Sequence, residues 1–123
     1  MRRIKSRDTL PEKTVRSLIH GMGYRYRLHG KDLPGKPDLV FSKKHKVIFV
    51  HGCFWHQHKG CTNARIQKTN QDFWVPKLEA TLARDANHLL RLREMGWEAL
   101  VIWECELKKD ADFVKANISA FLE

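Results

Sequence analysis

The fold is decided by "PDLVFSKKHKVIFVHGCFWH", residues 37–56. Two apolar runs, residues 39–41 and 47–50, flank the polar segment "SKKHK", and this pattern predicts two strands joined by a hairpin turn. The segment "LPGKP", which comes directly before, turns the chain into the first of these strands. The alternating segment "YRYRLH", residues 24–29, predicts another strand upstream. The last of the three strands runs directly into a concentration of histidine, cysteine and aromatic residues.

One helix is predicted before these strands and two after them. Thr9 and Glu12 have the spacing of a capping box at the start of the first helix. A fourth strand, "WEALVIWEC", separates the two later helices, and the last helix starts near Asp110. The apolar faces of these two helices are Leu78, Leu82, Leu89 and Leu92 in the first, and Phe113, Val114, Ile118 and Phe121 or Leu122 in the second. The order α-β-β-β-α-β-α predicts a single α/β domain over residues 1–123, with a mixed central sheet flanked by helices.

Length and charge narrow the class of protein. A chain of 123 residues has the size of one domain and can bury an ordinary core. Its 23 Lys and Arg residues against 14 Asp and Glu residues give a net charge of +9, which suits a polyanion such as nucleic acid. The sequence contains neither an apolar run of about 18 residues nor the apolar stretch of a signal peptide, so we expect a cytoplasmic protein.

The cysteines and histidines predict a zinc site. Three cysteines in a reducing compartment do not suggest a disulfide framework, and zinc favours four nitrogen or sulfur ligands. Alternatively, the remote cysteine is a buried thiol and the others are incidental. A histidine that does not bind zinc could act as a general acid or base, because histidine ordinarily titrates near neutral pH. The candidate ligands are Cys53, Cys61 and Cys105, with His51, His56 and His58 competing for the fourth position.

Asp38 is a candidate ligand for Mg²⁺. It follows a proline-containing turn and opens a strand, so its carboxylate could project from the sheet and bind a hard cation through oxygen. The alternative is that Asp38 caps its own turn. In restriction-endonuclease-like nucleases, the next strand carries a carboxylate-x-lysine motif. The corresponding segment here, "VIFVHG", has no such motif.

The adjacent Phe54 and Trp55 are candidate DNA contacts. They lie between potential metal-binding or catalytic residues, and such a pair can enter a base step and unstack it. The alternative is that one ring belongs to the core and the other covers the zinc site. Trp74 could join this wedge or pack against the start of its helix, whereas Trp97 and Trp103, in a strand pattern, are predicted to lie in the core.

Together these residues resemble the very-short-patch-repair DNA mismatch endonucleases. The matching stretches are "RDTLPEK", "LPGKPDLV", "VIFVHGCFWH", "DFW", "ARD" and "GWEALVIWEC", in this order, and they span nearly the whole chain. The resemblance implies a restriction-endonuclease-like core with a structural zinc. It also implies Mg²⁺-dependent nicking of one strand of double-stranded DNA, 5′ to the T of a T:G mismatch that arises by deamination of 5-methylcytosine.

The resemblance also implies roles for individual residues. Asp38 and the backbone carbonyl of Val50 would hold Mg²⁺, His56 would be the catalytic histidine, and Glu12 and His51 would support the active site. The zinc ligands would be Cys53, His58, Cys61 and Cys105, and the rings that enter the DNA stack would be Phe54, Trp55 and Trp74. We expect a monomer that works with other repair proteins.

The sequence departs from the family pattern in four places. Val50 stands where most members have Thr, Lys59-Gly60 adds one residue to the cysteine-histidine loop, and Asn70 replaces an Arg. The N-terminal arm of the family is expected to be short or absent. A site-specific or homing-type nuclease on the same core, or a non-catalytic zinc-stapled DNA-binding module, is the alternative reading.

Overall fold

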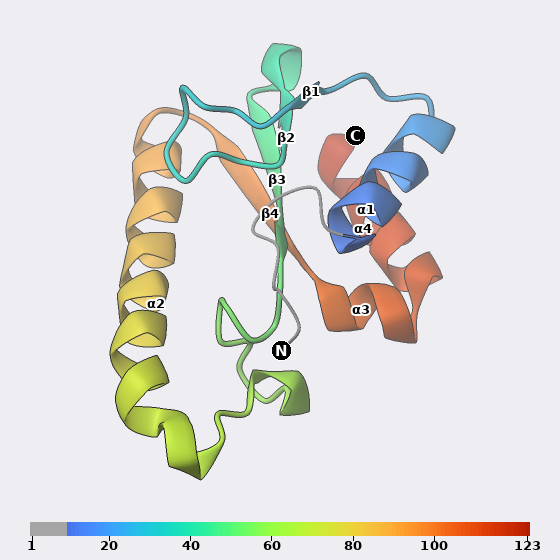
Figure 1. Ribbon diagram of the computed structural model, residues 1–123. Coiled ribbons are helices and arrows are strands. Elements are labelled where there is room, and N and C mark those ends of the chain that lie inside the picture. The colour runs from blue at the N-terminus through green and yellow to red at the C-terminus, as the bar shows by residue number, and fades with distance from the viewer. Residues whose placement is uncertain (1–9) are drawn as a thin grey trace.

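The computed structural model describes residues 10–123, so the predicted cap at Thr9 and the N-terminal arm lie outside the described residues. The described part is a mixed α/β fold in the predicted order, with one additional short helix, α3, after the last strand (Figure 1). The helices and strands are α1 (Leu10–Gly21), β1 (Arg27–Leu28), β2 (Leu39–Phe41), β3 (Lys46–His51), α2 (Gln71–Glu94), β4 (Glu98–Trp103), α3 (Glu104–Lys109) and α4 (Ala111–Leu122). Three short 3₁₀ helices connect them: η1 (Ser42–Lys44), η2 (Thr62–Ala64) and η3 (Lys68–Asn70).

The sheet has four strands in the order β1-β2-β3-β4. The first two pairings are antiparallel, and β3 pairs with β4 in parallel through the crossover helix α2, so the predicted mixed sheet is confirmed. Strand β1 is shorter than predicted, because only Arg27 and Leu28 pair with β2. His29 follows with φ of 50°, a left-handed conformation that ends the extended chain.

Strands β2 and β3 are buried on both faces. Leu39 and Ile48 point into a core that is closed by helices α1 and α4, which lie together on one side of the sheet (Figure 1). Val47 and Phe49 point to the opposite face, where Leu92 of helix α2 covers them (Figure 1). This two-sided burial explains why both strands read as continuous apolar runs. None of the helices within residues 10–123 has the length and apolar composition needed to cross a bilayer.

Two predicted helix faces are only partly correct. Leu78 and Leu92 of α2 are buried, but Leu82 and Leu89 are 44% and 36% exposed. At Leu89 the helix borders a pocket and not the sheet, so this position is left uncovered. In α4 the buried face is Val114, Ile118 and Leu122, spaced by four residues, while Phe113 is 51% exposed on the outside.

The two tryptophans of the last strand region are half-buried and not fully in the core. Trp97 packs against the α2 side of the sheet and stacks on His45, with ring centroids 5.0 Å apart. Trp103 stacks on His58, with centroids 4.1 Å apart and an interplanar angle of 5°. Cys105 lies in the first turn of α3 and not at the end of strand β4.

Candidate active site and metal centre

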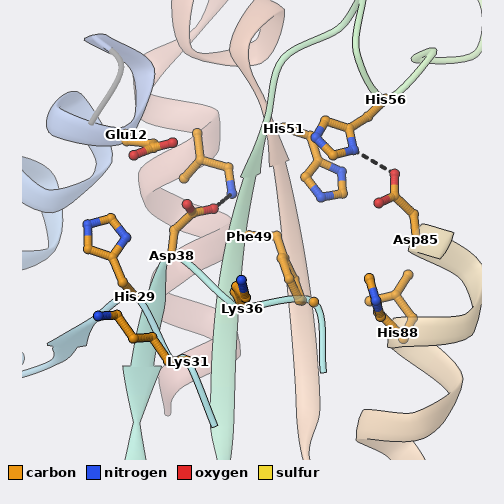
Figure 2. A pocket seen from close by; sticks show the side chains of 13 residues that line it. Glu12, His29, Lys31, Lys36, Asp38, Phe49, His51, His56, Asp85 and His88 are labelled. Atoms are coloured by element: carbon orange, nitrogen blue, oxygen red, sulfur yellow. Dashed lines mark hydrogen bonds and ion pairs between the residues drawn. The ribbon is translucent and has the colours of Figure 1, made fainter. Parts of the chain in front are cut away.

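A pocket of about 670 Å³ opens where strand β3 ends. Its walls come from helix α1, the loop between β1 and β2, the end of β3 and helix α2 (Figure 2). It is lined by five of the residues singled out in the sequence: Glu12, Asp38, Val50, His51 and His56. Residues far apart in the sequence therefore share one concave site, which is the usual arrangement of an enzyme active site.

Asp38 is held by the neighbouring strand. The backbone N–H of Val50 donates a hydrogen bond to Asp38 Oδ2 over 2.7 Å (Figure 2). The last residues paired between β2 and β3 at this end are Leu39 and Ile48. The Asp38 carboxylate therefore accepts from a backbone N–H of β3 that lies beyond the paired part of the two strands. This bond joins Asp38 to a residue of β3 and not to its own turn. The carboxylate and the Val50 peptide are thereby fixed next to each other.

The Asp38 carboxyl is poorly solvated. Its pKa is raised from 3.8 to about 7, mainly because the carboxyl is buried and also because of the negative charge of Glu12. The hydrogen bond from Val50 and the charges of Arg16 and His56 act in the opposite direction. Glu12 itself is only 4% exposed and is paired with Arg16, with 3.5 Å between Oε2 and Nη2. Carboxylate and carbonyl oxygens are the ligands that Mg²⁺ prefers, so Asp38 and the Val50 carbonyl fit such a cation.

His56 is oriented by an acidic residue that sequence reasoning missed. Its Nδ1 lies 2.6 Å from Oδ2 of Asp85, which projects from helix α2 into the pocket (Figure 2). The only sequence signal for Asp85 was its place in the matching stretch "ARD". A carboxylate in this position selects the tautomer with the proton on Nδ1 and leaves Nε2 for chemistry.

His51 lies against His56 as a neutral ring. The two imidazoles stack with centroids 3.7 Å apart and an interplanar angle of 5°. The pKa of His51 is lowered to about 4, mainly because the ring is buried and also because of the neighbouring His56, while Asp85 partly opposes the shift. Nδ1 of His51 is buried and has no hydrogen-bond partner within residues 10–123. Together His51, His56 and Asp85 place one nitrogen or oxygen each within 4.8 Å of one another.

A second cluster could hold a metal ion beside the pocket. Its ligand atoms come from Cys53, His58, Cys61 and Cys105 and lie within 4.8 Å of one another. His58 Nδ1 lies 3.3 Å from Sγ of Cys105 and 3.7 Å from Sγ of Cys53, and the cysteines form no disulfide. Of the three competing histidines, the structure brings His58 to the cysteines, whereas His51 and His56 lie in the pocket. Nitrogen and sulfur donors in this number fit zinc.

The loop between Cys53 and Cys61 carries two aromatic residues, Phe54 and Trp55, and the first turn of helix α2 adds Trp74. Phe54, Trp55 and Trp74 meet edge to face, with ring centroids 5.1 to 5.9 Å apart, and each is half-buried. They pack on one another and not into the two cores of the sheet. The additional residue at Lys59-Gly60 is accommodated by an exposed turn, in which Gly60 has φ of 76°.

Comparisons with known proteins identify the family and the fold of the chain. The family model described as "DNA mismatch endonuclease Vsr" matches residues 1–63. The chain is 48% identical over 123 residues to the type II nicking enzyme V.XorIIP of Xanthomonas oryzae pv. oryzae, covering 100% of this chain and 89% of that protein. It is 43% identical over 108 residues to the DNA mismatch endonuclease Vsr of Escherichia coli, covering 88% and 69% of the two chains. The catalytic domain of the homing endonuclease I-Bth0305I has a similar fold, with a TM-score of 0.63, 24% identity, and coverage of 93% and 94%.

Replacing Asp38 by Asn should change how protein stability depends on pH. The folded pKa of about 7 exceeds the ordinary 3.8, so the folded state binds this proton more tightly than the unfolded state does. The resulting stabilisation is fully present below about pH 4 and is lost as the pH rises through 7. Without added Mg²⁺, the melting temperature of the wild type should therefore fall relative to that of D38N between pH 4 and 8. Asp32→Asn, a change of an exposed residue in the same loop, is the control. If the melting temperatures of wild type and D38N depend on pH in the same way, the raised pKa of Asp38 is refuted.

Proposed function

This chain belongs to the DNA mismatch endonuclease Vsr family, and we propose that it nicks one strand of double-stranded DNA 5′ to the T of a T:G mismatch. Such mismatches arise when 5-methylcytosine is deaminated. The observation that carries the proposal is that one pocket holds both Asp38, tied to Val50, and the His56–Asp85 pair. A net charge of +9 suits a DNA partner. With one such pocket in each monomer, one strand would be cut.

Asp38 and the backbone carbonyl of Val50 would hold Mg²⁺. When bound there, the cation would supply charge stabilisation at the scissile phosphate and make an attacking water more acidic. The Val50 side chain belongs to the core on the α1 and α4 side of the sheet, so the family's usual Thr is not needed to present a carbonyl. Glu12, buried beside Asp38, would keep the pocket selective for cations.

His56 would transfer the proton. With Nδ1 donating to Asp85, Nε2 can take a proton from the attacking water, and the Asp85 carboxylate stabilises the positive ring that results. His51 would be a positioning residue, because its ring covers one face of His56 over 3.7 Å. Its pKa of about 4 keeps it uncharged near neutral pH, so it does not repel a protonated His56.

Zinc would be the scaffold of the loop. The four ligands Cys53, His58, Cys61 and Cys105 tie residues 53–61 to helix α3. Cys53 and His58 lie on either side of Phe54, Trp55 and His56 in the sequence. Fixing both ends of this short segment restricts the positions of the aromatic rings and of the proton-transferring ring.

Removing one zinc ligand should damage folding and not merely activity. We expect elemental analysis to find one zinc per purified chain, and Cys105→Ala to lose it and to melt at a lower temperature, because a structural zinc contributes folding free energy directly. Lys109→Ala, an exposed change in the same helix, should leave both quantities unchanged. If Cys105 is merely a packed thiol, C105A will melt slightly earlier but will keep the metal content of the wild type.

Asp85→Asn and His56→Ala should each slow single-turnover nicking by roughly 10²- to 10⁴-fold, the usual scale for general acid-base catalysis. The double variant should be little worse than either single variant, because the two side chains act as one unit. Both variants should retain zinc. Glu79→Gln, an exposed acid on the same helix, is the control. A fully active D85N would exclude the pair, and loss of zinc in H56A would mean that His56 is a ligand.

The mismatch preference should depend on Phe54 and Trp55. Entering a base step costs a few kcal/mol, and a weakly paired T:G step should cost less than a matched one. A T:G duplex should therefore be nicked far faster than its T:A counterpart, and replacing both rings by Ala should reduce this ratio as well as the rate. The ratio of the T:G rate to the T:A rate is measured by single-turnover nicking of both duplexes. The control is Phe113→Ala, which removes an exposed aromatic ring elsewhere in the protein.

Three results would contradict this reading. An unchanged T:G to T:A ratio in the double variant would remove the wedge from the mechanism. Equal nicking of matched and mismatched duplexes by the wild type would point to a site-specific nuclease on the same fold. Binding without any nicking would indicate a DNA-binding module.

A further inference from the structure

A second, smaller pocket lies beside the aromatic rings. It has a volume of about 200 Å³ and is lined by Phe54, Trp74, Arg65, Gln67 and Asn70. The two rings are half-buried, and the three polar side chains are exposed. As described for residues 10–123, the lining includes no carboxylate, in contrast to the larger pocket. Aromatic walls with a rim of cationic and amide side chains are suited to a nucleobase.

The polar side chains of this pocket do not serve the protein's own helices. Asn70 occupies the N-cap position of the 24-residue helix α2, where asparagine ordinarily accepts a hydrogen bond from the first turn. Its side chain makes no such bond, and neither does that of Gln67 before the 3₁₀ helix η3. Two amide groups that could cap helices are therefore available to a ligand.

Hydrogen bonds hold the backbone of the Arg65 segment next to the loop that carries Phe54. The short helix η2 begins directly after Cys61, and Arg65 follows it. The backbone N–H of Arg65 donates a hydrogen bond to the carbonyl of Thr62 over 3.1 Å. The Gln57 amide donates both to the carbonyl of Phe54, over 2.7 Å, and to that of Ala64, over 3.1 Å. The loop that carries Phe54 is thus tied to the segment that carries Arg65. The backbone and the packed rings of Phe54 and Trp74 therefore form a preformed frame, and the exposed rim side chains are attached to it.

The chemistry of the rim matches the edges of DNA bases. Arg can donate two hydrogen bonds to O6 and N7 of guanine, and Asn or Gln can form the paired contact with adenine. A phosphate would need only charge, which does not explain two aromatic walls and two amides in the same pocket. The rings of Phe54 and Trp74 are also the ones expected to enter the DNA stack, so a base displaced against them would present its edge to the rim.

We propose that Arg65, Gln67 and Asn70 read the base pair that flanks the mismatch, with Arg65 recognising a guanine, and that this pocket sets the sequence context in which the protein nicks. The proposal rests on the proposed function, because it assumes that Phe54 and Trp74 contact the DNA. It assigns a specificity-determining role to the segment between the metal centre and helix α2.

The test is nicking of two duplex libraries, one with a central T:G pair and one with T:A, each with randomised flanking base pairs. Sequencing of the single-turnover products gives the base preference at every position. The wild type should prefer G:C at one flanking position by roughly 5- to 150-fold, the range of one bidentate contact. Arg65→Ala should flatten that position, and Gln67→Ala and Asn70→Ala should weaken the preference there or at the next pair.

Arg65→Lys separates base reading from attraction to phosphate. Lysine keeps the charge but cannot form the paired contact, so R65K should lose the preference as R65A does. Lys68→Ala, an exposed change in the same segment outside the pocket lining, should lower the rate equally for all sequences. Zinc content and melting temperature show that each variant is folded.

The outcomes also distinguish this proposal from the proposed function. Base reading by this pocket is wrong if the wild type shows no flanking base preference, or if R65A or R65K keeps the preference of the wild type. Mismatch-dependent nicking is unaffected by any of these three results. If both libraries are nicked equally, the mismatch preference fails, and the flanking profile still supports or refutes the pocket. If neither library is nicked, both proposals are wrong.

Discussion

The register of the parallel pair β3–β4 is the constraint on which the cluster of Cys53, His58, Cys61 and Cys105 depends. Val50 lies opposite Ile102 and His51 opposite Trp103, so the chains leave the sheet side by side. Two residues further on, Cys53 and Cys105 can therefore approach the same His58 nitrogen. A slip by one residue would turn each side chain to the opposite face and separate these donors.

Burial works in opposite directions on two groups of the same pocket. It raises the pKa of Asp38 to about 7 and lowers that of His51 to about 4, because a buried site penalises the charged form of each. Between these two values both side chains favour their neutral forms. Above neutral pH the pocket therefore holds an unfavourable Asp38 charge, which a divalent cation bound as proposed would relieve.

The sequence predicts the order of helices and strands because hydrophobic period, turns and caps are local signals. It also indicates Cys53, Cys61 and Cys105, since their chemistry is unusual wherever they fold. It could not choose among the histidines, because ring direction in residues 51–58 depends on turns such as Gln57, with φ of 45°. Asp85 was missed for a related reason. Its partner is 29 residues away, and only the packing of α2 against the loop brings them together.

The exposed Leu89 is another position that the sequence pattern does not predict correctly, because its burial depends on how helix α2 packs. The helical spacing of apolar residues alone assigns Leu89 to the core, but at this position helix α2 borders the pocket and not the sheet.

In the proposed function, the residues that carry the chemistry differ from those that recognise the DNA sequence in how firmly the fold holds them. Asp38 and Cys53 are fixed by strand register and by hydrogen bonds to Val50 and Glu104, so the framework of the fold sets their positions. Residues 62–70 form two exposed 3₁₀ turns with few buried side chains, so their side chains can change at little cost in stability. Sequence context could thus diverge among related nucleases while the reacting groups stay in place.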